Sequence, residues 1–90
     1  MGFLKVTKAE YVTEYCIRLW FNNGEVRVAD LRESLVGPVF EPLRDVQLFM
    51  NFRIPYNTLE WENGADFAPE YLYSISQPSS KIKDYERVVH

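Results

Sequence analysis

The stretch Trp61-Glu62-Asn63-Gly64-Ala65-Asp66 holds the residue types best suited to contact another molecule. An exposed tryptophan beside carboxylates can hold a cationic side chain of a partner. The other interpretation is structural: Trp61 fills the core, Asn63-Gly64 forms a turn, and Asp66 accepts backbone N–H bonds near a following helix. Turns and caps are the more common use of such residues.

Three aspartates, Asp30, Asp45 and Asp66, are the residues from which an acid site or a divalent-cation site could be built. Their spacing does not require them to meet, and it matches no metal-binding loop. Each stands where a loop is expected to pass into a helix. Capping of three separate helix starts therefore explains them without any shared site.

Nucleophilic and histidine-dependent chemistry has little support in this sequence. His90 is the only histidine and the last residue, and Cys16 is the only cysteine. Triads and zinc clusters need more such groups, and Cys16, with no histidine to activate it, is expected to pack on the less apolar face of its strand. The glycines stand alone, so no phosphate-binding loop is expected. We expect no enzyme activity, no cofactor and no metal.

Composition and charge indicate one small domain with an acidic body. The chain has 90 residues, is 47% hydrophobic and carries a net charge of −3. Residues 1–76 contain seven basic and eleven acidic side chains, which disfavours binding of the body to nucleic acid. Residues 77–90 are a weakly basic polar tail, for which both an ordered and a disordered conformation are compatible with the sequence. The start lacks a signal-peptide run, no apolar stretch reaches a membrane span, and one cysteine fits a reducing compartment, so we expect a cytoplasmic protein that enters no membrane.

The clearest local signal is a hairpin around Asn23-Gly24. Apolar residues alternate over 15–21, and Asn-Gly is the strongest signal for a two-residue loop. A two-residue loop pairs Phe21 with Val26 and collects the aliphatic partners on one face, whereas a three-residue loop sets Phe21 opposite Glu25 and mixes the faces. The pattern therefore predicts the two-residue loop.

The same register places Trp20 opposite Arg27 on the other face of the hairpin. Trp20 then packs under the stem of Arg27, or it faces a partner.

The remaining elements are expected to complete a small α+β domain. They are a first strand over 5–12, a helical turn over 31–36, a helix over 46–51 capped by Asp45, a second hairpin with the loop 55–58, and a short helix that starts at Pro69. The second hairpin pairs Phe52 with Trp61, and the residues from Ser76 onward are expected to form a loop. We predict a small antiparallel sheet built from the two hairpins plus the N-terminal strand, with the short helices packed on one face.

Several short blocks also occur in a characteristic order. They are Phe21-Asn22-Asn23-Gly24-Glu25, Asp30-Leu31, Gly37-Pro38-Val39-Phe40-Glu41-Pro42-Leu43-Arg44-Asp45 with Phe49 after it, Leu59-Glu60-Trp61-Glu62-Asn63-Gly64-Ala65-Asp66, and Pro69-Glu70-Tyr71-Leu72-Tyr73. With these blocks the chain resembles the domain-of-unknown-function family 2442 over residues 5–76. The resemblance implies a small bacterial α+β domain without an established activity. It also implies a gene often found beside a member of a second family of unknown function, 4160, in pairs that resemble toxin–antitoxin modules. Some longer relatives add a helix-turn-helix domain, for which the residues after Ser76 are too few.

These observations lead to a main hypothesis and an alternative. The first is a non-enzymatic protein-interaction module, in its specific form the antitoxin-like member of a two-gene module, whose partner is the product of an adjacent gene; a homodimer is a further option. The alternative is a nucleic-acid-associated transcriptional regulator that acts through the basic tail or a partner. The candidate interaction surface consists of Trp20, Arg27, Trp61, Glu62, Asp66 and Tyr71.

Overall fold

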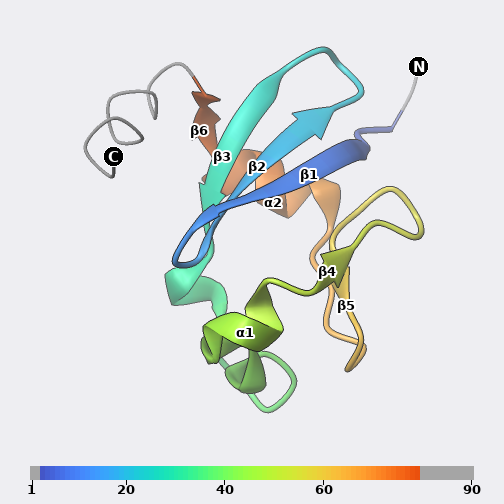
Figure 1. Cartoon of the computed structure of the whole chain (residues 1–90). Coiled ribbons are helices and arrows are strands. Elements are labelled where there is room, and N and C mark those ends of the chain that lie inside the picture. The colour runs from blue at the N-terminus through green and yellow to red at the C-terminus, as the bar shows by residue number, and fades with distance from the viewer. Residues whose placement is uncertain (1–2, 80–90) are drawn as a thin grey trace.

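The largest element of the computed structural model, which describes residues 3–79, is a four-stranded antiparallel sheet (Figure 1). Its strand order is β1-β2-β3-β6. The strands are β1 (Val6–Thr13), β2 (Cys16–Phe21), β3 (Val26–Asp30) and β6 (Gln77–Pro78). A separate two-stranded sheet consists of β4 (Phe52–Arg53) and β5 (Glu60–Trp61).

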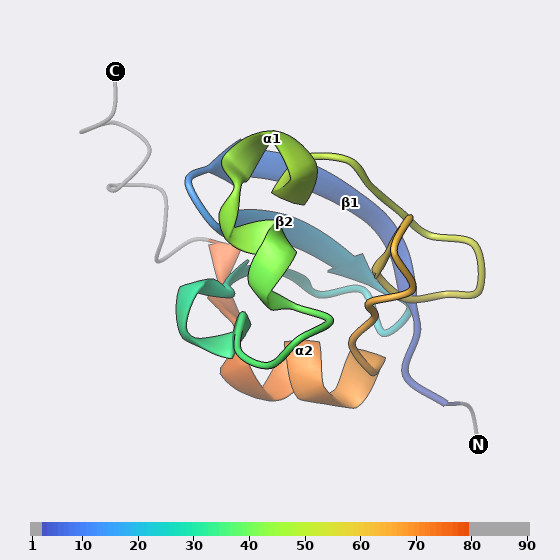
Figure 2. The same cartoon turned by 90° about the horizontal axis from the view of Figure 1, so that it is seen from below.

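Short helical segments follow β3 and β5. They are the 3₁₀ turns η1 (Arg32–Ser34) and η2 (Glu41–Arg44) and the helices α1 (Val46–Phe49) and α2 (Pro69–Ile75). Seen from below, α1 lies in front of β1, and α2 lies below β2 in the view (Figure 2). Phe49 of α1 and Leu72 of α2 both join the buried cluster that includes Ile17 and Leu19 of β2. The expected α+β class, with helices on one face of an antiparallel sheet, is therefore confirmed.

One face of the four-stranded sheet forms the core. In β2 the side chains of Ile17, Leu19 and Phe21 are buried, while the alternating Cys16, Arg18 and Trp20 are only partly buried. This period of two is what a strand with one covered face requires. The buried face packs in a single cluster with residues of the helical segments and of β5.

The predicted register of the first hairpin is wrong. Phe21 donates its backbone N–H to the carbonyl of Glu25 at 2.9 Å, so the loop has three residues rather than two. Leu19 then pairs with Arg27 and Trp20 with Val26. Phe21 and Val26 consequently lie on opposite faces, and Trp20 and Arg27 do not face each other.

The charged side chains that this register places on the core face are held by α2. Arg27 donates from Nε to Ser76 Oγ at 2.7 Å and from Nη1 to Glu25 at 2.7 Å. Its guanidinium lies 4.3 Å from the centre of the Tyr73 ring, and the Tyr73 hydroxyl donates to Glu25. A satisfied polar cluster at the margin of the core therefore removes the penalty that led us to reject the mixed register.

The second hairpin has the predicted register, with Phe52 paired to Trp61 and Arg53 to Glu60. It differs from the expectation in forming its own sheet instead of extending the main one. Its strands have two residues each, and its apolar side chains pack against the core. The backbone of Val6 in β1 meets it at the β4–β5 loop, where Val6 donates to the Asn57 carbonyl at 2.8 Å.

One of the three expected aspartate caps is confirmed: Asp45 accepts from the Gln47 N–H at 2.9 Å at the start of α1. The expected cap by Asp30 is wrong, because the residue at the start of η1 is Leu31, without a side-chain cap; Asp30, one residue earlier, accepts from the Arg32 N–H at 3.0 Å as a local turn. The expected cap by Asp66 is wrong. The residue at the start of α2 is Ala68, which has no side-chain cap. Asp66 lies two residues before this position and forms a β-bridge with Glu60.

The chain after α2 is not the loop that we expected. Gln77 and Pro78 form β6 and pair with Val28 and Arg27 of β3. Residues 80–90, which include most of the predicted polar tail and His90, lie outside the described residues.

Candidate functional site

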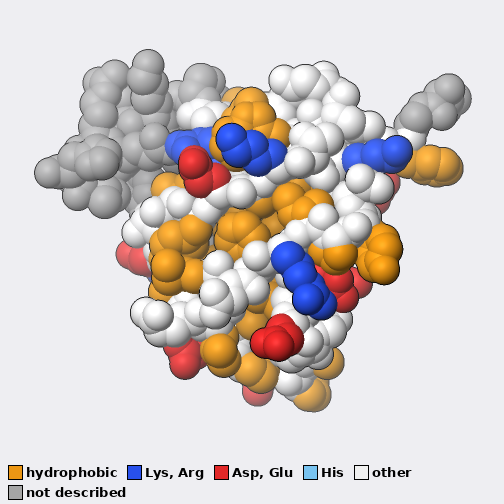
Figure 3. Space-filling model, turned by 45° about the vertical axis from the view of Figure 1, so that its right-hand side comes forward, with side chains coloured by type: hydrophobic (Ala, Val, Ile, Leu, Met, Phe, Trp, Pro, Cys, Tyr) orange, Lys and Arg blue, Asp and Glu red, His pale blue; other side chains and the backbone are white. Residues whose placement is uncertain are grey.

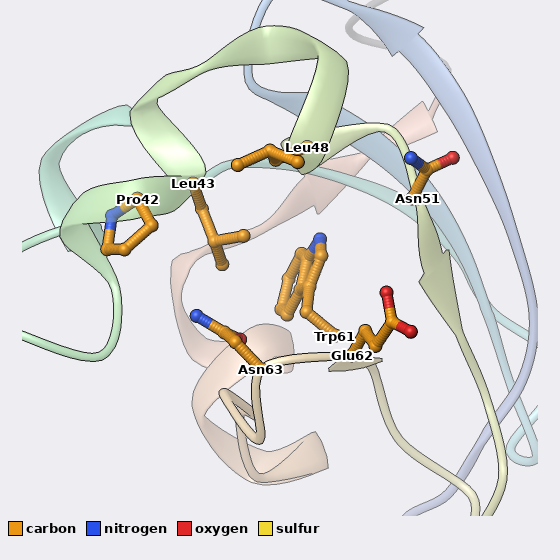
Figure 4. A pocket seen from close by; sticks show the side chains of 7 residues that line it. All are labelled: Pro42, Leu43, Leu48, Asn51, Trp61, Glu62 and Asn63. Carbon is orange, nitrogen blue, oxygen red and sulfur yellow. The ribbon is translucent and has the colours of Figure 1, made fainter.

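A pocket of about 270 Å³ lies beside the ring of Trp61 on the described surface (Figure 4). We call it the Trp61 pocket, and its lining consists of Pro42, Leu43, Leu48, Asn51, Trp61, Glu62 and Asn63. Its walls come from η2 and α1 on one side and from β5 and its following turn on the other. A volume of this size fits one or two amino-acid side chains, and it is small for a cofactor.

The turn after β5 is built by Asn63 and Gly64. Trp61 donates its N–H to the Ala65 carbonyl at 2.8 Å, and Asn63 Oδ1 accepts from the Ala65 N–H at 3.1 Å. Gly64 has φ = 92°, a left-handed conformation in which a side chain is unfavourable. Asn63 Nδ2 also donates to the Val39 carbonyl at 2.8 Å, which ties the two walls of the pocket together.

Trp61 forms the floor of the pocket, and its position is fixed. The residue is 1% exposed, and its indole Nε1 donates to the carbonyl of Phe49 at 2.8 Å. Its ring packs edge-on against Phe67, with ring centres 5.9 Å apart. The prediction of an exposed Trp61 that grips a partner directly is therefore wrong, and its structural interpretation is confirmed.

Exposed apolar side chains occur in the pocket lining and in the segments next to it. Leu48 on α1, which lines the pocket, is 48% exposed, and Val39 before η2 and Met50 after α1 are exposed to a similar degree. Figure 3 shows one face of the molecule on which hydrophobic side chains form broad exposed areas between charged groups. Solvent-exposed apolar groups next to a hollow with a rigid floor are typical of a surface that binds another protein.

The polar part of the rim consists of hydrogen-bond acceptors. The carboxylate of Glu62 has no ion pair or hydrogen bond with any residue of 3–79, and the same holds for Oδ1 of Asn51. In the view of Figure 4 both side chains are on one side of the indole, and Pro42 and Leu43 are on the other. The pocket thus presents an apolar surface flanked by acceptors, which suits an apolar side chain next to a Lys or Arg.

The structure does not bring the six predicted surface residues together. Trp61 and Glu62 belong to the Trp61 pocket, whereas Arg27 is bonded within the core-face cluster and Trp20 lies on the outer face of the sheet. Lys8 Nζ is 4.6 Å from the centre of the Trp20 ring.

The other two predicted residues also lie apart from the pocket. Asp66 is exposed but engaged through its backbone with Glu60. Tyr71 on α2 is 41% exposed, stacks on Phe67 and shares a hydrogen bond of 2.6 Å with Ser34 Oγ.

Residues 3–79 offer no cluster of metal ligands and no activated thiol. No group of three or more His, Cys, Asp or Glu side chains in this part of the chain could hold a metal ion. Burial raises the pKa of the Cys16 thiol to about 11, and the nearby Asp30 carboxylate adds to this effect. Cys16 is therefore protonated at neutral pH and a poor nucleophile. Within 3–79 no helix combines the length and the apolar character needed to cross a membrane.

The sequence interpretation missed Leu48, Pro42 and Asn51, which line the pocket. One signal for Leu48 was present in the sequence. Leu48 lies off the apolar stripe of α1 that Val46 and Phe49 define, so its side chain could not be buried together with theirs and had to lie at the surface.

The alternative hypothesis of a nucleic-acid regulator depends on the basic tail, most of which lies outside the described residues, and it stays a prediction.

A family model of proteins of unknown function, DUF2442, matches residues 6–78. The chain belongs to this family. The match includes every strand and helix described above and all the residues of the Trp61 pocket. No curated protein matches the chain, and no solved structure does.

Proposed function

We propose that this member of the DUF2442 family is a protein-interaction module that receives a side chain of its partner in the Trp61 pocket. The observation that carries the proposal is the combination of a fixed indole floor, the half-exposed Leu48 and the Glu62 carboxylate, unpaired within residues 3–79, around one hollow. A buried aromatic floor with an apolar rim is the usual surrounding of a residue that dominates a protein interface.

The partner that this surface fits carries an apolar side chain next to a basic one. The acidic body of the chain attracts a basic surface from a distance, and Glu62 contacts it at the pocket. In its specific form the module is the antitoxin-like member of a two-gene pair, and the product of the adjacent gene is the partner. The motivation for this form is the gene pairing that the resemblance to the family implies. We place both proteins in the cytoplasm, because the single cysteine fits a reducing compartment.

The test is co-expression of the chain with the product of its adjacent gene, followed by affinity pull-down at several salt concentrations. The variant Leu48→Glu introduces a charge at the mouth of the pocket and should reduce the recovered partner about tenfold or more. Tyr56→Glu is the matched control, because Tyr56 is 83% exposed in the β4–β5 loop and lies outside the pocket. Recovery of the bait alone at every salt concentration contradicts the proposal, and so does equal recovery with Leu48→Glu.

A second pair of variants tests the contribution of the Glu62 charge to partner capture. Glu62→Lys should weaken capture of the partner and remove part of its salt dependence. Glu33→Lys is the control, because Glu33 is equally an exposed carboxylate but lies in η1, away from the pocket. If both substitutions weaken capture equally, net charge rather than Glu62 is responsible.

A further inference from the structure

The two edges of the main sheet differ in length and in backbone chemistry. At one edge, β6 has two residues, and one of them is Pro78, which has no N–H to donate. At the other edge, β1 has eight residues and pairs on one side only, with β2 (Figure 1). An edge strand with free backbone groups can pair with another chain.

The backbone groups that point out of the sheet can be assigned from the hairpin. Phe21 donates its N–H to Glu25, so the polar groups of Phe21 face β3, and by alternation those of Leu19 face β3 as well. Leu19 is the β2 partner of Ala9, so the N–H and C=O of Ala9 point away from the sheet. Within residues 3–79 the outward groups of Ala9 have no backbone partner, whereas the Val6 N–H is bonded to Asn57.

The exposed side chains around Ala9 have opposite charges in a symmetric arrangement. Lys8 and Glu10 flank Ala9, and both lie on the outer face, opposite Trp20 and Arg18 of β2. If two copies of β1 pair antiparallel with Ala9 opposite Ala9, Lys8 of each copy faces Glu10 of the other. A contact between identical surfaces requires this kind of self-complementarity.

Neighbouring registers bring like charges together. A pairing centred on Lys8 sets two lysines opposite each other, and one centred on Glu10 sets two glutamates opposite each other, which is unfavourable. The regular part of β1 between its two irregularities runs from Lys8 to Tyr11, so the central pairs fall where the strand is straight.

We propose that two copies of this chain form a homodimer through antiparallel pairing of β1 with β1, centred on Ala9. The pairing joins the two main sheets into one. On its outer face each Glu10, which accepts from Arg18 Nη1 at 2.8 Å, gains the partner copy's Lys8 as a second cation. The Trp61 pocket is not part of the pairing, so the dimer is independent of the proposed function. Because the straight segment is short, the dimer is reversible, with a dissociation constant of about 1 to 100 μM.

The test is sedimentation equilibrium of the full chain, with circular dichroism to confirm that each variant folds. The wild-type chain should dimerise reversibly. Ala9→Pro removes the outward N–H, which an edge strand tolerates, and should raise the dissociation constant about tenfold or more. Lys5→Glu changes a charge just outside β1 and should leave the constant within about twofold.

Two complementary variants test the register even if Ala9→Pro fails to fold. Lys8→Glu places two glutamates opposite each other in its homodimer, and Glu10→Lys places two lysines opposite each other, so each variant alone should be monomeric. Mixed one to one, they should form a heterodimer, because both cross-strand pairs are then attractive. A wild-type chain that stays monomeric up to about 1 mM overturns the proposal. Variants that dimerise as well as the wild type also overturn it, because the contact then lies on another surface.

Discussion

The turns at 21–25 and 61–65 have the same backbone and different surroundings. In each, the first residue donates its N–H to the carbonyl of the fifth, at 2.9 Å in one and 2.8 Å in the other. The asparagine Oδ1 accepts the N–H of the residue two positions later, at 3.0 Å and 3.1 Å. The glycines that follow have φ = 90° and 92°. Phe-Asn-Asn-Gly-Glu and Trp-Glu-Asn-Gly-Ala therefore specify one local structure.

The difference lies in what each turn is attached to. The first connects long strands, and its Glu25 belongs to the polar cluster with Arg27 and Tyr73. The second follows a two-residue strand and is held by the Trp61 indole and by the bond from Asn63 to Val39. The first turn completes the sheet, and the second builds the wall of a pocket. The local sequence determines the conformation of each loop, and tertiary contacts determine its structural role.

Removing the anchor of the second turn should have the largest effect. Trp61→Ala deletes a fully buried ring and should lower the free energy of unfolding by about 3 to 5 kcal/mol. Trp61→Phe keeps most of the volume but leaves the Phe49 carbonyl without its donor, and should cost about 1 to 3 kcal/mol. Urea unfolding measures both. Equal losses for the two variants would mean that the indole hydrogen bond matters more than the volume.

The two glycines should respond alike, because their conformations are alike. An added Cβ at Gly24 or Gly64 has no heavy atom within 4 Å, so Gly→Ala at either position costs only the left-handed backbone, about 1 to 2 kcal/mol. The same unfolding experiment applies. A difference between the two above about 1 kcal/mol would show that the turns are not equivalent.

Substitution of the asparagine should have a larger effect in the second turn than in the first. Asn63→Ala loses its bonds to Ala65 and to Val39 and should cost about 1 to 2 kcal/mol. Asn23→Ala loses the corresponding bond to Glu25 and only a long contact of 3.4 Å to the Glu25 side chain, so about 0.5 to 1 kcal/mol is expected. Only Asn63→Ala should also weaken partner capture, since it loosens the pocket wall. Capture weakened by both variants, or by neither, would contradict this assignment.

The smallest effect concerns the polar cluster of the first hairpin. The hydroxyl of Tyr73, and after it the guanidinium of Arg27, hold the pKa of Glu25 below its ordinary value of 4.5. A carboxyl with a lowered pKa stabilises the fold above its unfolded pKa, and this contribution is lost as the pH falls below about 4.5. In Tyr73→Phe the pKa of Glu25 should rise toward 4.5, which NMR titration of the carboxyl carbon detects. An unchanged pKa would assign the shift to Arg27 alone.

Much of the fold was predictable because local rules and the tertiary structure agree. The alternation in β2, the Asp45 cap, the Pro69 start and the Phe52–Trp61 register all follow from short-range chemistry. The register of the first hairpin was predicted wrongly, because the three-residue loop was rejected for placing Arg27 on the core face, and the group that satisfies Arg27 there, Ser76, is 49 positions away in the sequence. The pairing of β6 with β3 depends on the same long-range arrangement.

The candidate site was predictable only in part. Trp61 and Glu62 were recognised from their residue types, but the pocket needs η2 and α1 beside β5. Nothing local in the sequence places Pro42 and Leu48 next to Trp61. The burial of Trp61 was one of the two interpretations of its stretch, but its hydrogen-bond partner, the Phe49 carbonyl of another element, could not be predicted.

The most direct test uses the two tryptophans as reporters of two surfaces. Trp61 lies beneath the proposed binding pocket, and Trp20 lies on the outer face of the sheet. The ¹⁵N-labelled chain is titrated with the purified product of the adjacent gene, and the two indole N–H signals are followed by NMR at a constant chain concentration. A partner bound in the Trp61 pocket should shift or broaden the Trp61 signal together with the amides of Leu48 and Glu62, while the Trp20 signal does not move. A shift of Trp20 without a change at Trp61 would contradict binding at this pocket.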